Sequence, residues 1–162
     1  MSTLVSLLAE FYRDKLEALL RHQRNAAGVS QYDCNNTYQY IIGREEVQLS
    51  WLAKAIEDGG GTMPPSSGAA ADATKDRGTP AERVIAEGDA REAQAFVDRW
   101  KPRVDAMTHA RHRGMLRVIL GETLEQKRFF EQAAAGRLDL LGQRSDQTGP
   151  RIGHVLSTRW IE

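Results

Sequence analysis

The sequence has only one cysteine, Cys34, among its 162 residues. A single cysteine cannot form a disulfide within the chain, and a lone thiol is typical of proteins from reducing compartments. Residues 1–15 lack a basic leader followed by a continuous apolar core, and no run approaches the roughly 20 apolar residues that a membrane helix needs. We therefore expect a cytoplasmic protein that has no membrane partner.

Net charge is absent as well, because 22 Lys and Arg residues balance 22 Asp and Glu residues. Without a broad positive field, nucleic-acid binding is not expected. Aromatic residues make up only 7% of the chain, whereas Ala, Leu, Glu, Arg and Gln are abundant, which favours helices over strands. A chain of this length most simply forms one all-α domain with a single core.

Common catalytic motifs are also missing. No glycine-rich phosphate loop leads from a strand into a helix, no cysteine pair offers a zinc site, and no Gly-x-Ser-x-Gly elbow occurs. The glycines at 59–61 follow the end of a predicted helix and are interpreted as linker. The sequence therefore gives no sign of phosphate-loop, structural-zinc or serine-hydrolase chemistry.

The sequence does contain the hydrophobic periodicity of four long amphipathic helices. The predicted helices cover residues 3–27, 36–58, 79–107 and 108–135. Gly28 and Gly136 follow the first and the last of them, and each is expected to adopt a left-handed conformation that ends its helix.

The third helix has a clear predicted start. Thr79 is expected to be its N-cap, with Pro80 at the first helical position and Glu82 completing a capping box. Met107 stays in phase with the apolar stripe of this helix, so we expect the helix to continue past Pro102 with a kink.

The connections between the helices predict the topology. Residues 28–35 form a short link, which implies antiparallel neighbours. Residues 59–79 form a linker that can span the second helix, about 35 Å long, at ~3.3 Å per residue. The third helix can thus start at the end where the second helix started, which makes one long crossover.

Two regions follow from these predictions. Residues 1–136 are expected to form the bundle, and residues 137–162 a C-terminal extension. Apolar side chains near the end of the extension would be unusual in a free tail. They predict a short docking helix that contains Ile152, Val155, Leu156, Trp160 and Ile161.

Polar residues interrupt the apolar stripes of all four helices. We expect them to form a polar interior network of Lys15, Glu45, Gln48, Asp89, Glu122 and Gln126. A buried carboxylate such as Glu45 is costly unless a cation, a metal ion or hydrogen bonds neutralise it. Lys15 supplies that cation if it reaches Glu45; alternatively, its ammonium extends to the edge of the bundle.

The helix pattern resembles that of the ferritin-like superfamily, which includes ferritins, bacterioferritins and rubrerythrins. The resemblance spans residues 3–135. It implies that the second and fourth helices each carry Glu-x-x-His and the first and third each carry one Glu, which together hold two metal ions. The second-helix motif is matched by Glu45 with Gln48 in the histidine position, and Lys15 stands where the first helix would supply a carboxylate.

Two registers fit the fourth helix. Aligning the Ile-Gly pair of the second helix with the Leu-Gly pair of the fourth places Thr123 and Gln126 in the motif. Counting 33 residues from Asp89 places Glu122 and Glu125 there instead. Neither register supplies a histidine. An alternative site for iron or manganese would consist of Glu45, Asp89, Glu122 and Glu125.

The loss of both histidines, with the helix pattern retained, favours a non-catalytic module for structure or protein interaction that needs no cofactor. A homodimer is one assembly that such a module could form. Two alternatives remain: a metal-binding oxidase of the same fold with carboxylate ligands, and a helical small-molecule binder that uses the interior around Lys15. His109 and His112 could also grip an ion on a helix face, although the sequence offers no third ligand.

Overall fold

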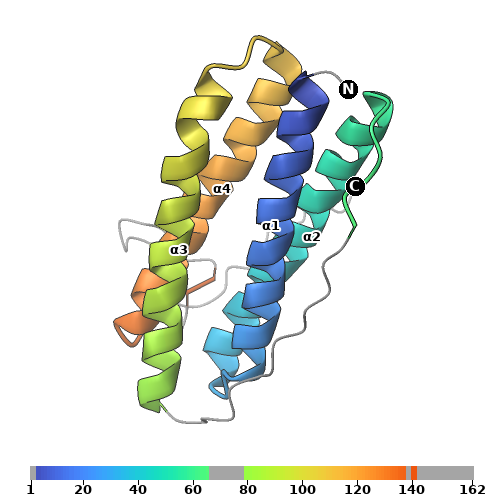
Figure 1. Cartoon of the computed structure of the whole chain (residues 1–162). Coiled ribbons are helices and arrows are strands. Elements are labelled where there is room, and N and C mark those ends of the chain that lie inside the picture. The colour runs from blue at the N-terminus through green and yellow to red at the C-terminus, as the bar shows by residue number, and fades with distance from the viewer. Residues whose placement is uncertain (1–2, 66–78, 138–139, 142–162) are drawn as a thin grey trace, which may run out of the picture.

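The computed structural model describes residues 3–65, 79–137, 140 and 141, with only the backbone described at 79–81. It contains four helices: α1 (Thr3–Ala27), α2 (Tyr32–Asp58), α3 (Thr79–Asp105) and α4 (Ala110–Ala134). The described residues include no strand, which confirms the all-α prediction for this part of the chain (Figure 1). None of the described helices has an apolar stretch long enough to cross a membrane.

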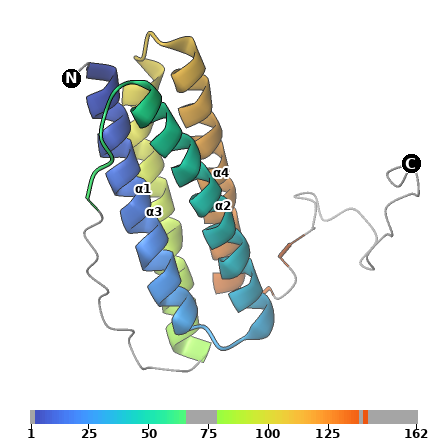
Figure 2. The same cartoon turned by 90° about the vertical axis from the view of Figure 1, so that its right-hand side faces the viewer.

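The helices pack as two pairs. α1 lies along α2 and α3 along α4, and the pairs are stacked so that α1 faces α3 and α2 faces α4 (Figure 2). The start of α3 lies beside the turn between α1 and α2, where the Glu82 carboxylate accepts a 2.7 Å hydrogen bond from the Ser30 backbone N–H. The end of α2 lies at the other end of the bundle, because Gly59 is close to Val5 near the start of α1.

The turn between α1 and α2 is shorter than predicted. α2 begins at Tyr32 and not at Asn36. The Gln31 side chain caps the helix by accepting a 2.6 Å hydrogen bond from the Cys34 backbone N–H. Asn35 then donates its side-chain amide to the carbonyl of Ala26 at the end of α1. Glutamine is not among the residues favoured at this position, so sequence reasoning had no N-cap signal there.

One prediction about helix ends needs correction. Gly28 is not left-handed; it is buried, and a Cβ atom there would make an ordinary van der Waals contact 3.5 Å from Ile85 Cδ1. The Glu82 carboxylate joins α3 to the neighbouring turn, because its Oε1 atom accepts hydrogen bonds from Ser30 and Gln31, whereas the side chain of its predicted capping partner Thr79 lies outside the described part of the chain. The left-handed stop at Gly136 is confirmed, with φ of 85°.

α3 and α4 meet at a short connection. α3 continues past Pro102, as predicted, but it ends at Asp105, two residues before the predicted end. α4 begins at Ala110, two residues later than expected, because His109 is its N-cap and accepts a hydrogen bond from the His112 backbone N–H through Nδ1. The docking helix predicted around Trp160 lies outside the described residues.

The core runs the length of the bundle and draws on all four helices. At one end, the Phe11 ring packs edge-on against Phe96 and Trp100, with ring centroids 5.3 and 4.8 Å apart. The Trp100 indole N–H also donates a 2.8 Å hydrogen bond to Asp14. These contacts hold α1 against α3 on one side of the polar interior described next.

We predict opposite effects of alanine at two glycines. A Cβ atom at Gly61 would lie 2.5 Å from Val5 Cγ1 and 2.9 Å from Ile56 Cγ2, whereas Gly114 in α4 has no atom within 4 Å of a Cβ. Gly61→Ala should lower the free energy of unfolding by about 1–3 kcal/mol through overpacking. Gly114→Ala should raise it by about 0.5–1 kcal/mol through helix propensity. Urea unfolding monitored by circular dichroism measures both; equal midpoints for Gly61→Ala and the unmodified chain would contradict the packing described.

Candidate functional site

The most unusual feature of the interior is a buried ion pair between α1 and α2. Lys15 Nζ donates a 2.9 Å hydrogen bond to Glu45 Oε1, and these two side chains are 1% and 0% exposed. The Lys15 ammonium also lies 5.5 Å from the centroid of the Phe96 ring on α3, a favourable cation–π distance. Lys15 therefore does not extend to the edge of the bundle, and the alternative in which it reaches Glu45 describes the structure.

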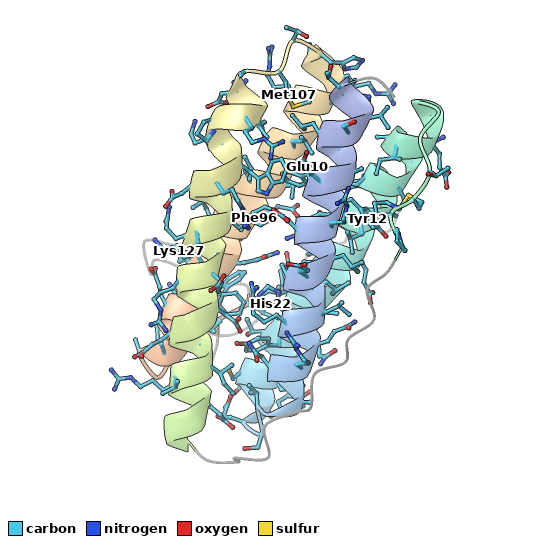
Figure 3. The ribbon with its side chains drawn as sticks, viewed as in Figure 1. Glu10, Tyr12, His22, Phe96, Met107 and Lys127 are labelled. Atoms are coloured by element: carbon cyan, nitrogen blue, oxygen red, sulfur yellow. The ribbon has the colours of Figure 1, made fainter. Side chains whose placement is uncertain are left out.

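His22 completes the surroundings of the Glu45 carboxylate. Its Nδ1 atom lies 2.8 Å from Glu45 Oε2, and the imidazole is only 3% exposed (Figure 3). Burial by itself would raise the pKa of Glu45, but the hydrogen bonds and charges of His22 and Lys15 outweigh burial and lower that pKa below its usual value of 4.5. Glu45 is thus held as a carboxylate by protein groups on α1.

A second buried carboxylate, Asp89 on α3, lies on the far side of the same imidazole. Asp89 accepts hydrogen bonds from the Tyr38 hydroxyl at 2.5 Å and from the Asn25 amide at 3.0 and 2.8 Å. Arg21, which is partly exposed, donates from Nε at 3.3 Å. Burial, followed by the charge and hydrogen bond of Asp89, raises the pKa of the Tyr38 phenol, so Tyr38 stays protonated and donates.

The His22 imidazole thus stands between two carboxylates. Its Nδ1 faces Glu45, and its Nε2 lies 3.9 Å from Asp89 Oδ1, too far for a direct hydrogen bond. Nε2 has no hydrogen-bond partner among the described residues. With a proton on each nitrogen, the ring would carry a positive charge between two negative ones.

The remaining predicted residues form a separate group between α2 and α4. Gln48 donates its amide to Glu122, and Arg44 donates to the other oxygen of Glu122 at 2.6 Å. Gln48 is fully buried, whereas the Glu122 side chain is 25% exposed at the edge of the bundle. The Gln48 amide group therefore donates to Glu122 and not to Glu45.

The structure distinguishes the two registers of the fourth helix. Thr123 and Gln126 are buried, and the Thr123 hydroxyl donates to the Ile119 carbonyl of its own helix. The register that places Glu125 in the interior is wrong. The Glu125 side chain lies on the surface, 49% exposed and 3.7 Å from Arg128. Gln126 Nε2 and Gln48 Oε1 are buried and have no hydrogen-bond partner among the described residues.

The predicted alternative metal set is not gathered in one place. Glu45 is occupied by Lys15 and His22, Asp89 by groups of α1 and α2, and Glu122 by Arg44 and Gln48. Over residues 3–65, 79–137, 140 and 141, no three His, Cys, Asp or Glu side chains converge closely enough to hold a metal ion. The ligand set Glu45, Asp89, Glu122 and Glu125 would therefore require these pairings to break.

Four interior partners were not anticipated from the sequence, and they are Arg21, His22, Asn25 and Tyr38. Their spacing carried a signal. His22 follows Lys15 by seven residues, and Glu45 follows Tyr38 by seven, so each pair shares one helix face. His22 itself lies within the buried stripe of α1.

The other candidate groups lie elsewhere. The His109 and His112 rings stack at 4.2 Å at the start of α4. The start of α4 lies beside the start of α1 (Figure 1), whereas His22 belongs to the second half of α1. Burial, and then the charges of His109 and Arg111, lower the pKa of His112. Burial and the charge of Glu82 raise the pKa of the Cys34 thiol to about 11, so this thiol is a poor nucleophile at neutral pH.

Removing one partner of the buried ion pair should destabilise the fold more than replacing both partners with uncharged residues. Lys15→Met leaves Glu45 with His22 as its only partner, and should lower the free energy of unfolding at pH 7 by about 3–5 kcal/mol. Lys15→Met combined with Glu45→Gln should restore part of that loss, because the amide oxygen still accepts from His22. Lys54→Met, at an exposed i,i+4 pair with Asp58, is the control and should cost at most about 0.5 kcal/mol. A double variant that is less stable than Lys15→Met would contradict this account.

The lowered pKa of Glu45 also predicts how stability depends on pH. Because the folded state favours the carboxylate, the stabilisation from Glu45 is complete above pH 4.5 and is lost as the pH falls through the lowered pKa. Urea midpoints measured from neutral pH into the acid range should fall less steeply for Glu45→Gln than for the unmodified chain. Glu46→Gln, one residue away and exposed, should keep the steep fall; parallel curves for all three proteins would refute the assignment.

Comparisons of the chain with protein-family models, curated proteins and solved structures found no match. No relative therefore supplies a ligand set or a substrate for this chain. The polar interior and the outer faces of the helices are the features that bear on its function.

Proposed function

We propose that this protein is a ferritin-like four-helix bundle, with one long crossover between α2 and α3, in which a protein ion pair takes the place of a di-metal centre. We further propose that it acts in the cytoplasm as a metal-independent structural or interaction module and not as an enzyme. The observation that carries the proposal is the 2.9 Å contact between Lys15 Nζ and Glu45 Oε1 in a fully buried setting.

The charge of the interior supports this proposal. A metal ion held by Glu45 would have to displace the Lys15 ammonium, which would then be buried next to a second cation. Gln48 stands where the family carries a histidine, and an amide oxygen is a weaker ligand for iron than an imidazole. The Lys15 ammonium thus neutralises the Glu45 carboxylate, as a metal ion would in the ferritin-like family that the chain resembles.

The positions of the helix ends support the proposed topology. α2 ends beside Val5, whereas α3 starts beside Ser30, at the other end of the bundle. The connection from the end of α2 to the start of α3 must therefore span the length of α2, as in a ferritin-like bundle. The connecting residues 66–78 lie outside the described part of the chain.

The alternative functions each lack a matching observation. A carboxylate-ligated oxidase needs Glu45, Asp89 and Glu122 on one ion, whereas each has its own protein partners. A small-molecule binder that uses Lys15 needs a route from solvent to its ammonium, and the Lys15 side chain is 1% exposed. Metal analysis addresses the oxidase directly.

The test compares metal content in the unmodified chain and in a variant designed to bind metal. Purified protein should contain far less than one equivalent of iron or manganese, and its melting temperature should not change when a chelator is added. Lys15→Glu combined with Gln48→His restores two family-type ligands beside Glu45 and should raise metal retention and make stability sensitive to chelator.

Glu125→Ala is the matched control, since this carboxylate lies on the surface. About two equivalents of iron or manganese per unmodified chain, lost in Glu45→Ala and kept in Glu125→Ala, would overturn the proposal in favour of the oxidase.

A further inference from the structure

The outer side of α2 and α4 carries large apolar side chains that remain exposed to solvent in the described part of the chain. Tyr40, Val47 and Trp51 follow one another on α2 at intervals of seven and four residues and are 46%, 39% and 36% exposed. Val118 on α4 is 52% exposed. We call these four residues the α2–α4 face.

Contacts across the two helices place these residues on one continuous surface. The Tyr40 ring packs edge-on against Phe129, with centroids 6.2 Å apart, and Gln48 contacts Glu122. Because α2 and α4 run antiparallel, one further turn along each helix brings Trp51 and Val118 to the same level. Figure 2 shows α2 and α4 side by side along this side of the molecule.

Arg44 and two glycines lie near the middle of the face. Arg44 lies between Glu122, to which it donates at 2.6 Å, and the Trp51 ring, whose centroid is 5.8 Å from its Cζ atom. Among the described residues, no atom lies within 4 Å of a Cβ position at Gly43, one turn from both Tyr40 and Val47, or at Gly121, one turn from Val118. Glycine weakens a helix, and no contact within the described part of the chain requires it at these two positions.

The same chain contains an apolar segment outside the described residues. Residues 142–162 continue from Leu140, which is buried in the core, and Leu141, which is 38% exposed. In this segment the apolar residues recur at i, i+3, i+4 and i+8, a spacing that places them on one side of a helix. They are Ile152, Val155, Leu156 and Trp160.

The lengths of the segment and the face agree. The chain leaves the bundle near the end of α4, about 24 Å along the axis from Val118 at ~1.5 Å per residue. Residues 142–151 can span about 33 Å, which is enough to reach any part of the face. Residues 152–160 in a helix would be about 14 Å long, against about 16 Å from Tyr40 to Trp51.

We infer that residues 150–162 of the chain dock on the α2–α4 face, with Trp160 and Leu156 covering Tyr40, Val47, Trp51 and Val118. A tether of about ten residues gives the segment an effective concentration near the millimolar range, so weak apolar contacts suffice to hold it. The segment thus competes with any other protein for this face. The inference concerns the outer surface and is independent of the proposed function of the interior.

The first test compares the full chain with a chain that ends at Leu141, which retains every core residue of the described bundle. Removing the segment should shift backbone amide resonances of residues 40–51 and 118–129 and leave α3 unchanged. It should also lower the melting temperature by about 2–4 °C. A peptide of residues 150–162, added at about 1 mM, should reverse the amide shifts, and the same peptide with Trp160→Ala should not.

The second test uses full-length chains, so it does not depend on the shortened protein folding. Trp51→Ala and Trp160→Ala should each lower the melting temperature, and the double variant should lose little more than either single variant. Val84→Ala, at an exposed valine on α3, is the control and should add independently to Trp160→Ala.

Three outcomes would overturn the inference. They are additive effects of Trp51→Ala and Trp160→Ala, amide shifts confined to other surfaces, and a dimer that forms through the α2–α4 face equally in the full and shortened chains. The last outcome, measured by light scattering over a range of concentrations, would assign the face to a second copy of the chain.

Discussion

The bundle depends on keeping the Glu45 carboxylate ionised inside an apolar core. Because Glu45 is completely buried, it must receive both of its charge-compensating contacts from protein groups, and α1 supplies them through Lys15 and His22. A buried ion pair of this kind adds little net stability compared with a well-packed apolar pair. It instead penalises any other alignment of α1 on α2, since a shift of one turn would leave a charge without a partner.

The same logic extends to α3. Asp89 draws one donor from α2, Tyr38, and others from α1, Asn25 and Arg21, so three helices meet at one carboxylate. His22 lies between this carboxylate and Glu45 and connects the two groups. Above this polar layer, the rings of Phe11, Phe96 and Trp100 interlock. Directional polar contacts thus set the register of the helices, and apolar burial supplies the driving force for their packing.

This division between interior and surface limits where function can reside. The interior polar groups are largely committed to one another, and Lys15 and Glu45 have almost no contact with solvent. The outer side of α2 and α4, in contrast, exposes Trp51 and Val118 and keeps glycines where larger residues would fit. The closed polar centre and the open apolar surface are the two observations on which the proposed interaction role rests.

The sequence by itself determined the number of helices, their approximate extents and the presence of Lys15 and Glu45 on buried stripes, because hydrophobic periodicity acts locally. Only the tertiary structure decided which side chains meet. Successive residues are 100° apart on a helix, so a small rotation of α4 exchanges an interior Glu125 for an interior Gln126, and packing against α2 and α3 selects the second. Likewise, the pairing of His22 with Glu45 and of Tyr38 with Asp89 joins residues 23 and 51 positions apart. Such contacts depend on how the helices are stacked, which no local pattern encodes.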